Sequence, residues 1–270
     1  MTIDYLAARN ILVAVKGHAY DHEPFRTMLD AIASARPGLT WTIVEQPGVD
    51  ALIEAQALDR FAAILFYDMS GITPGGPEQL TLIDPPHKLQ RGFETLLAKG
   101  MPLLFLHHAI ASWPAWPRFA RLTGGRYLFQ PRVIDGVLVP DAGYIHDQIH
   151  HVAPVMPHPV TAGLEDGFDL EDELYLFDVF EEDVIPLMAS DHMFSTSNFH
   201  SSALAVGGRL FDNEGWDRPP GSALFAWMRH EGASDIIYIQ GGHGPTAYGN
   251  AGYRTLLGNA IDWLIRDKAA

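Results

Sequence analysis

The chain has 270 residues, with 18 Lys and Arg against 33 Asp and Glu, a formal net charge of −15 and no cysteine. The missing cysteine excludes disulfide scaffolds, thiolate zinc sites, iron–sulfur clusters and cysteine nucleophiles. The negative charge, with no Lys/Arg cluster to offset it, argues against nucleic acid or anionic lipid as a partner.

We expect one cytoplasmic domain over residues 1–270 and no membrane partner. The segment MTIDYLAARN at the N-terminus has no basic region, long apolar stretch or cleavage site typical of a signal peptide. No stretch approaches the roughly 20 apolar residues that a membrane span needs. The chain contains neither an internal repeat nor a low-complexity tail.

The first half of the chain alternates short apolar runs with helical periodicity. Strands are expected over residues 11–15, 41–44, 62–67 and 102–106, and helices over 24–35 and 87–99. Each run is apolar at consecutive positions, which is typical of strands covered on both faces in a parallel sheet. The order predicts an α/β fold, doubly wound, with a mostly parallel sheet.

The second half is less regular. Residues 124–221 are rich in Pro, Gly, His and Asp and hold only brief apolar runs. We expect loops and short β-excursions laid over one end of the sheet. Two strands, at 223–228 and 236–240, and a final helix over 252–266 complete the chain.

Polar side chains follow several of the predicted strands. His18 follows the first, Asp68 the third, His107 and His108 the fourth, and His243 the last. Ligands bind beyond the carboxyl ends of open parallel sheets, so these residues predict a site. Imidazole is suited to proton transfer or metal binding, although any one of these histidines is equally a hydrogen-bonded loop residue. Alternation along an extended chain predicts that His107 and His108 do not point into the same cleft.

His146 and His150 form a second candidate metal motif. Their spacing places them on one face of either a helix or a strand. The motif lacks the Glu of a HExxH helix, and spacing identifies no third ligand. A polar strand edge is the preferred alternative.

Two further groups carry candidate chemistry. Asp172 and Glu173 stand beside Tyr175, and paired carboxylates can divide acid and base roles, although such a run is more often solvated. Trp113 and Trp116 offer flat apolar rings for sugars but are also ordinary core residues. The chain has neither a GxGxxG motif after the first strand nor a Walker motif, so no nucleotide cofactor is expected.

Taken in order, several segments resemble the ThuA-like (trehalose utilisation) family. They are LHHAI at 106–110 with the two tryptophans, LTGGRY at 122–127, HPVTAGL at 158–164, DELY at 172–175, GH at 242–243 and NAIDW at 259–263. The resemblance implies a flavodoxin-like fold similar to class I glutamine amidotransferases. In those enzymes the strand matching 102–106 ends in a nucleophilic cysteine. Because His107 and His108 stand there instead, amidotransferase chemistry is excluded.

The family is associated with the uptake and breakdown of trehalose and related disaccharides, in pathways that oxidise a sugar hydroxyl to a ketone. The resemblance places the family's motif residues on His107, His243, Asp172, Glu173 and Tyr175. Our leading interpretation is an enzyme acting on a sugar or keto-glycoside. His107 and His243 would transfer protons, and Glu173 or Asp172 would complete the pair. The residues expected to bind the substrate are His18, Asp68, His108, Trp113, Trp116 and Tyr175.

A divalent metal, Zn²⁺ or Mn²⁺, is a variant of this hypothesis, because imidazole and carboxylate ligands suit these ions without thiolates. Its candidate ligands are His107, His243, His146 and His150.

The rival hypothesis is a non-catalytic sugar-binding or regulatory protein on the same scaffold. A hydrolase using Ser70, Ser112 or Ser201 is least favoured, since none has a Gly-x-Ser-x-Gly context. Residues 190–221, which include His192 and His200, are longer and more polar than the family pattern, and their role stays open. A homo-oligomer is compatible with the sequence.

Overall fold

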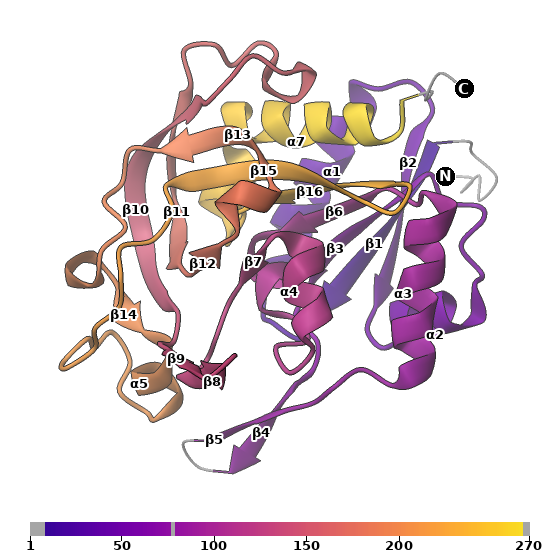
Figure 1. Cartoon of the computed structure of the whole chain (residues 1–270). Coiled ribbons are helices and arrows are strands. Elements are labelled where there is room, and N and C mark those ends of the chain that lie inside the picture. The colour runs from indigo at the N-terminus through magenta and orange to yellow at the C-terminus, as the bar shows by residue number, and fades with distance from the viewer. Residues whose placement is uncertain (1–8, 77–78, 267–270) are drawn as a thin grey trace.

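The computed structural model describes residues 9–76 and 79–266. Their central element is a 10-stranded sheet (Figure 1). Residues 1–8, part of the segment for which no signal peptide was expected, lie outside the described residues. One half of the sheet is parallel. Its strands, in spatial order, are β2 (Leu39–Glu45), β1 (Arg9–Lys16), β3 (Ala63–Asp68), β6 (Leu103–Leu106) and β16 (Ser234–Ile239). This is the flavodoxin-like order, and it confirms the predicted α/β class.

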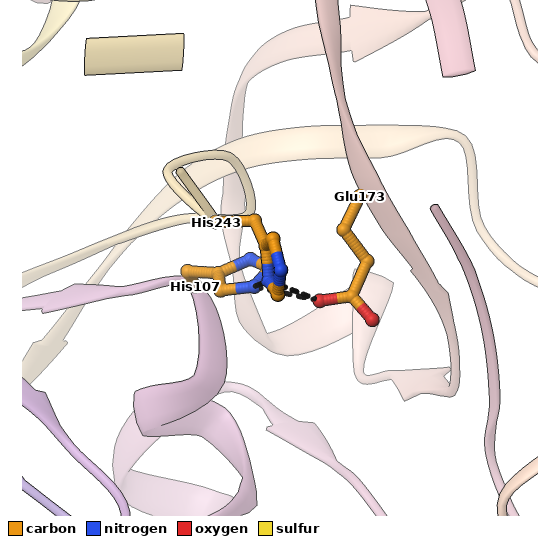
Figure 2. Close-up of side chains that lie close together, drawn as sticks. All are labelled: His107, Glu173 and His243. Atoms are coloured by element: carbon orange, nitrogen blue, oxygen red, sulfur yellow. Dashed lines mark hydrogen bonds and ion pairs between the residues drawn. The ribbon is translucent and has the colours of Figure 1, made fainter. Parts of the chain in front are cut away.

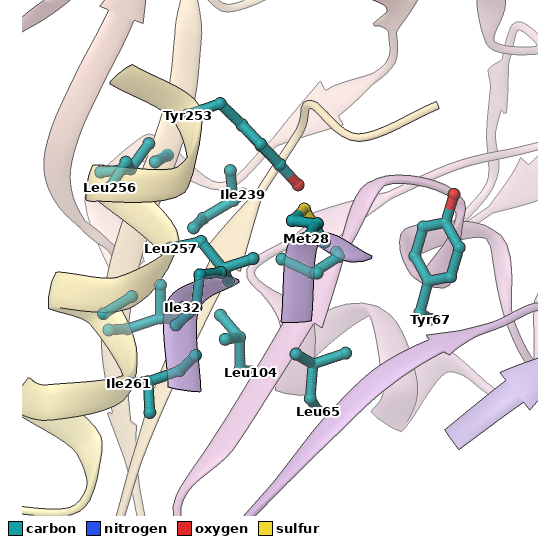
Figure 3. Close-up of a cluster of buried hydrophobic side chains, with 14 of the residues drawn as sticks. Met28, Ile32, Leu65, Tyr67, Leu104, Ile239, Tyr253, Leu256, Leu257 and Ile261 are labelled. Atoms are coloured by element: carbon teal, nitrogen blue, oxygen red, sulfur yellow. The ribbon is translucent and has the colours of Figure 1, made fainter. Parts of the chain in front are cut away.

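Helices cover both faces of the parallel half. On one face lie α1 (His22–Ser34), α6 (Pro245–Gly249) and α7 (Ala251–Leu264), and on the other α2 (Gly48–Ala55), α3 (His87–Lys99) and α4 (Pro117–Thr123) (Figure 1). Successive strand residues therefore enter different cores: Leu104 packs with α1 and α7, and Phe105 with α3. Figure 3 shows the first of these cores. Because both faces of these strands are buried, their sequences are apolar at consecutive positions.

The other half of the sheet is antiparallel, and it corrects one expectation. Outward from β16 lie β15 (Leu224–Glu231), β13 (Ile185–Ser190), β10 (Gly143–Pro154) and β11 (Phe168–Leu176), with β14 (His200–Ser201) beside β10. These strands extend the central sheet instead of lying over its end. The sequence obscured them because β10 and β11 carry histidines and carboxylates among their apolar residues.

Short elements complete the described chain. They are the pairs β4 (Ile72–Gly76) with β5 (Gln79–Leu82), β8 (Arg132–Ile134) with β9 (Val137–Val139) and β7 (Gly125–Arg126) with β12 (Asp178–Val179), helix α5 (Ser202–Val206), and the 3₁₀ turns η1 (His107–Ala111), η2 (Pro159–Thr161), η3 (Glu181–Asp183) and η4 (Thr196–Asn198). Of the helices within residues 9–76 and 79–266, none is long and apolar enough to cross a membrane.

Candidate functional site

Three side chains from distant parts of the sequence meet beyond the carboxyl ends of β6 and β16, where β11, the edge strand of the antiparallel half, reaches the parallel half (Figure 2). His107 directly follows β6, Glu173 lies on β11, and His243 follows β16. Glu173 Oε2 is 2.9 Å from His107 Nε2 and 2.8 Å from His243 Nδ1, and the two nitrogens are 3.1 Å apart. We call these three residues the His–Glu–His triad. It is the one group of three potential metal ligands found among the residues that the structure describes.

The backbone orients His107 before any ligand binds. Its Nδ1 donates a hydrogen bond to the carbonyl oxygen of Gln240 at 2.8 Å. Because a carbonyl only accepts, Nδ1 carries a proton and Nε2 faces Glu173 and His243. His107 has a φ of +48°, an uncommon conformation for a non-glycine residue. A strained backbone at this position is typical of a functional site.

Strand alternation places Glu173 and Tyr175 on the same side of β11, and both reach His107. The Tyr175 hydroxyl lies 2.9 Å from His107 Nε2. Burial opposes ionisation of Glu173, but hydrogen bonds from the two triad histidines hold the pKa of this carboxyl far below its ordinary value. Burial, followed by the charge of Glu173, raises the pKa of Tyr175 well above its ordinary value. Tyr175 therefore stays a neutral phenol that can donate a hydrogen bond.

Asp172 points to the loop that carries His243. Its two carboxylate oxygens accept the backbone N–H groups of Gly242 at 2.6 Å and of His243 at 3.0 Å. Gly242 has a φ of +113°, and a Cβ there would collide with the Tyr253 hydroxyl. The loop therefore needs a glycine at 242. Asp172 acts on His243 by positioning its backbone.

The triad is open to solvent on the side of His243 and His146. Side-chain exposure is 32% for His243 and 35% for His146, against 6% for Glu173. His146 Nε2 lies 3.4 Å from Glu173 Oε1. Burial lowers the pKa of His243, but the hydrogen bond and charge of Glu173 outweigh it and raise the pKa above its ordinary value. His18, whose ring centroid is 5.9 Å from that of His243, has its pKa lowered by burial and then by His107.

His107 and His108 take different neighbours, although both lie in the 3₁₀ turn η1 and not in the extended segment from which this was predicted. The His108 ring stacks on His18 with 4.6 Å between centroids, and its Nε2 donates to the Tyr67 carbonyl at 3.3 Å. Burial lowers the pKa of His108 well below its ordinary value, so this imidazole is neutral. His108 therefore supports the His18 ring by stacking against it.

The expectation that His146 and His150 share a face is wrong. The register of β10 against β11 shifts between Ile145 and Gln148, where β10 carries one extra residue. This bulge turns His146 toward Glu173, whereas His150 bonds Ser190 Oγ at 2.9 Å and lies near Phe225. Only His146 of this pair reaches the triad.

The other predicted substrate-binding residues lie apart from the triad. Asp68 is buried and accepts hydrogen bonds from the Gln46 amide at 2.8 Å and the Ser70 hydroxyl at 2.8 Å. Trp113 and Trp116 line a cavity of about 590 Å³. Tyr127, which lines the same cavity, contacts Tyr175 with 5.2 Å between ring centroids.

The serine hydroxyls are committed to structural hydrogen bonds. Ser70 donates to the Asp68 carboxylate, Ser112 to the Asp68 backbone carbonyl and Ser201 to Asp141. These contacts do not form a nucleophile–base pair.

Sequence reasoning missed Gln240. Besides accepting from His107, it accepts the Tyr175 backbone N–H through Oε1 at 2.9 Å, and so links two site residues. The one signal in the sequence was its place at the end of a predicted strand, directly before Gly241.

Comparison with known proteins agrees with this architecture. A family model described as trehalose utilisation (ThuA) matches residues 10–264. A search of curated proteins found no match.

Among solved structures, a ThuA-like protein from Parabacteroides merdae is similar with a TM-score of 0.64 and 17% identity, over 97% of this chain and 91% of that one. A ThuA-like protein from Bacteroides uniformis has a TM-score of 0.60 and 16% identity, over 99% and 96%. A β-galactosidase from Halorubrum lacusprofundi has a TM-score of 0.52 and 10% identity, over 96% of this chain but 31% of that one. At these identities, the likenesses concern the fold alone. The family match covers nearly the whole sequence, and the chain therefore belongs to the ThuA (trehalose utilisation) family.

Proposed function

We propose that this chain is an enzyme of disaccharide or keto-glycoside metabolism and that its reaction takes place at the His–Glu–His triad. The observation that carries the proposal is the convergence of His107, Glu173 and His243 from three separate elements within 4.8 Å. The family description supports a sugar as substrate. The net charge of −15 is compatible with a neutral ligand.

The donor atoms fit a divalent cation. The Gln240 carbonyl occupies Nδ1 of His107, so Nε2 is the atom that His107 would offer to an ion, 2.9 Å from Glu173 Oε2. A bound cation would take the place of the hydrogen bond between these two atoms. The three candidate ligand atoms lie 2.8–3.1 Å from one another, so one ion could contact all of them after a small adjustment of the side chains. Two imidazoles and one carboxylate also form a common catalytic metal-ligand set.

His107, Glu173 and His243 would hold Zn²⁺ or Mn²⁺, which supplies Lewis acidity toward a sugar carbonyl or hydroxyl oxygen. The surrounding residues provide the proton chemistry. His18 is neutral near pH 7, because its pKa is lowered, and it is placed to accept a proton from a substrate hydroxyl. Tyr175 remains a phenol, and its hydroxyl lies beside the triad, where it can donate a hydrogen bond to a substrate oxygen. Asp172 and Gln240 keep His243 and His107 in place.

A second candidate is acid–base catalysis by the triad without a metal. It is favoured by one observation: Glu173 raises the pKa of His243, so this partly exposed imidazole can hold a proton and deliver it to a leaving oxygen. Chelation separates the two candidates, because only the metal-dependent reaction is lost after treatment with EDTA and restored by Zn²⁺ or Mn²⁺.

Turnover of a panel of keto-disaccharides and keto-glycosides, followed by NMR of the products, tests the proposal. We expect His107→Ala and His243→Ala to abolish product formation, and His87→Ala, an exposed histidine at the start of α3, to leave it unchanged. If both triad variants turned over the panel as the unmodified chain does, the proposal would be wrong. Saturable binding of these sugars with no product under any metal condition would support the non-catalytic alternative.

A further inference from the structure

We propose that Phe211 is the stacking platform of an outer subsite, where it receives a second ring of the substrate while the first ring reacts at the triad. The substrate class is then a disaccharide, or a glycoside with a ring-shaped leaving group, and not a free monosaccharide. This inference rests on the proposed function and adds a binding position for a second ring to the same site. It also gives a role to residues 190–221.

Phe211 lies close to the triad although it is far from it in sequence. Its ring centroid is 5.8 Å from that of His146, and the His146 centroid is 5.1 Å from that of His243. One imidazole thus separates Phe211 from the triad. The Phe211 side chain is also exposed: 61% of its surface is accessible. A large apolar ring at the open side of a polar site is available to a ligand.

The backbone of Phe211 is held in a costly conformation. Its φ is +58°, a region that glycine and asparagine adopt easily and that a bulky side chain adopts rarely. A turn with no other duty would favour one of those residues. The Phe211 N–H donates to the Tyr144 hydroxyl at 3.0 Å, which fixes the turn against β10. An aromatic side chain kept in a strained conformation beside a site points to a role in binding.

Ion pairs hold the same turn in place before a ligand arrives. Arg209 Nε donates to Asp212 at 2.8 Å, and Arg209 Nη2 donates to Glu214 at 2.7 Å. The backbone carbonyl of Asp212 accepts the Ser201 N–H at 2.9 Å, at the start of α5. Little conformational entropy is then lost when a ring stacks on Phe211, and this preorganisation favours binding.

The surroundings of Phe211 match the two sides of a sugar ring. A pyranose has apolar C–H faces that pack on an aromatic ring and hydroxyls around its edge. His146 and His200 lie beside Phe211, each with 5.8 Å between centroids, and their ring nitrogens are hydrogen-bonding groups. The combination of an apolar face and polar edges is typical of sites for amphipathic rings.

Calorimetric titration with two probes tests the subsite. One probe is trehalose with one hydroxyl oxidised to a ketone, and the other is methyl glucoside oxidised at the same position. We expect Phe211→Ala to weaken binding of the disaccharide by about tenfold, the upper range for an aromatic contact, and binding of the methyl glycoside by less than about twofold. Phe211→Trp should retain disaccharide binding.

Leu210→Ala is the matched control, because Leu210 is the preceding residue and is 63% exposed. It should bind both probes as the unmodified chain does. If Phe211→Ala changed both affinities equally, or neither, while the unmodified chain bound both probes, the subsite would be refuted and the proposed function would stand. If the unmodified chain bound neither probe, the proposed function would fall and the subsite with it.

Discussion

The two halves of the sheet are built on different principles. In the parallel half, β3 is buried at all six positions, because helices cover both of its faces. In the antiparallel half, β10 mixes buried, half-buried and exposed residues and contains a bulge. The parallel half supplies His107 and His243 from strand ends, and the antiparallel half supplies Glu173, Tyr175 and His146. The site therefore exists only where the halves meet.

The largest expected effect comes from removing what the antiparallel half adds to the triad. Glu173→Gln keeps the shape of the side chain but removes the charge between the two histidines. We expect kcat/KM for the best keto-glycoside to fall by about 10²- to 10⁴-fold, the range for loss of a positioned catalytic group. Glu171→Gln is the matched control, since Glu171 lies two residues away on β11 and is exposed. Equal activity in both variants would mean that the chemistry belongs to the parallel half alone.

The second prediction concerns a histidine of the antiparallel half that serves stability. Burial, and then the nearby His192, lowers the pKa of His150 to about 4. The unfolded chain therefore binds more protons at this residue than the folded chain does between about pH 6.5 and pH 4. Stability from this residue is fully present above pH 6.5 and is lost as the pH falls through that window. The loss amounts to about 3 kcal/mol.

Urea unfolding of the chain and of His150→Asn at intervals from pH 7.5 to pH 4 measures this contribution. The variant should lose less free energy of unfolding over that range than the unmodified chain. If the free energy of unfolding fell equally with pH in both chains, protonation of His150 would not contribute to the pH dependence of stability. His151→Asn is a control with the opposite environment: it is exposed, and a hydrogen bond to Asp169 raises its pKa.

The smallest of the three effects tests how the halves are joined. Asp172→Asn retains one acceptor for the loop before α6 but no longer accepts both N–H groups of Gly242 and His243. We expect kcat/KM to fall by about 10- to 100-fold, as for other outer residues that orient a ligand. Amide hydrogen exchange at Gly242 and His243 should also become faster.

Asp169→Asn is the comparison for this change, because its side chain is 79% exposed on the same strand. It should alter neither activity nor exchange in the loop. If Asp172→Asn reduced activity while amide exchange at Gly242 and His243 stayed as slow as in the unmodified chain, the carboxylate would instead have a direct chemical role.

Much of the parallel half could be predicted because burial on both faces leaves a continuous apolar signature. The predicted helix over 87–99 matches α3, and Gly100, in the left-handed conformation, ends it. The antiparallel half was harder to predict. Its strands keep one partly polar face, and the bulge in β10 breaks the alternation on which the pairing of His146 with His150 depended.

Part of the candidate site could also be predicted from the parallel half. Strand ends in a parallel sheet meet at one edge, so His107 and His243 could be placed near each other from sequence. The direction of Glu173 toward them depends on the register of β11 against β10, a contact that no local pattern specifies. Gln240 orients His107 through its backbone carbonyl, and the Phe211 ring lies near the triad because of a turn with a positive φ. No local sequence pattern specifies either arrangement.

The most direct test of the proposed metal site is anomalous diffraction from crystals soaked in Zn²⁺ or Mn²⁺ at pH 7.5. We predict one strong peak bonded to His107 Nε2, His243 Nδ1 and Glu173 Oε2 at about 2.0–2.2 Å, and no such peak in Glu173→Gln crystals. Metal bound elsewhere, with the triad still joined by direct hydrogen bonds, would contradict it.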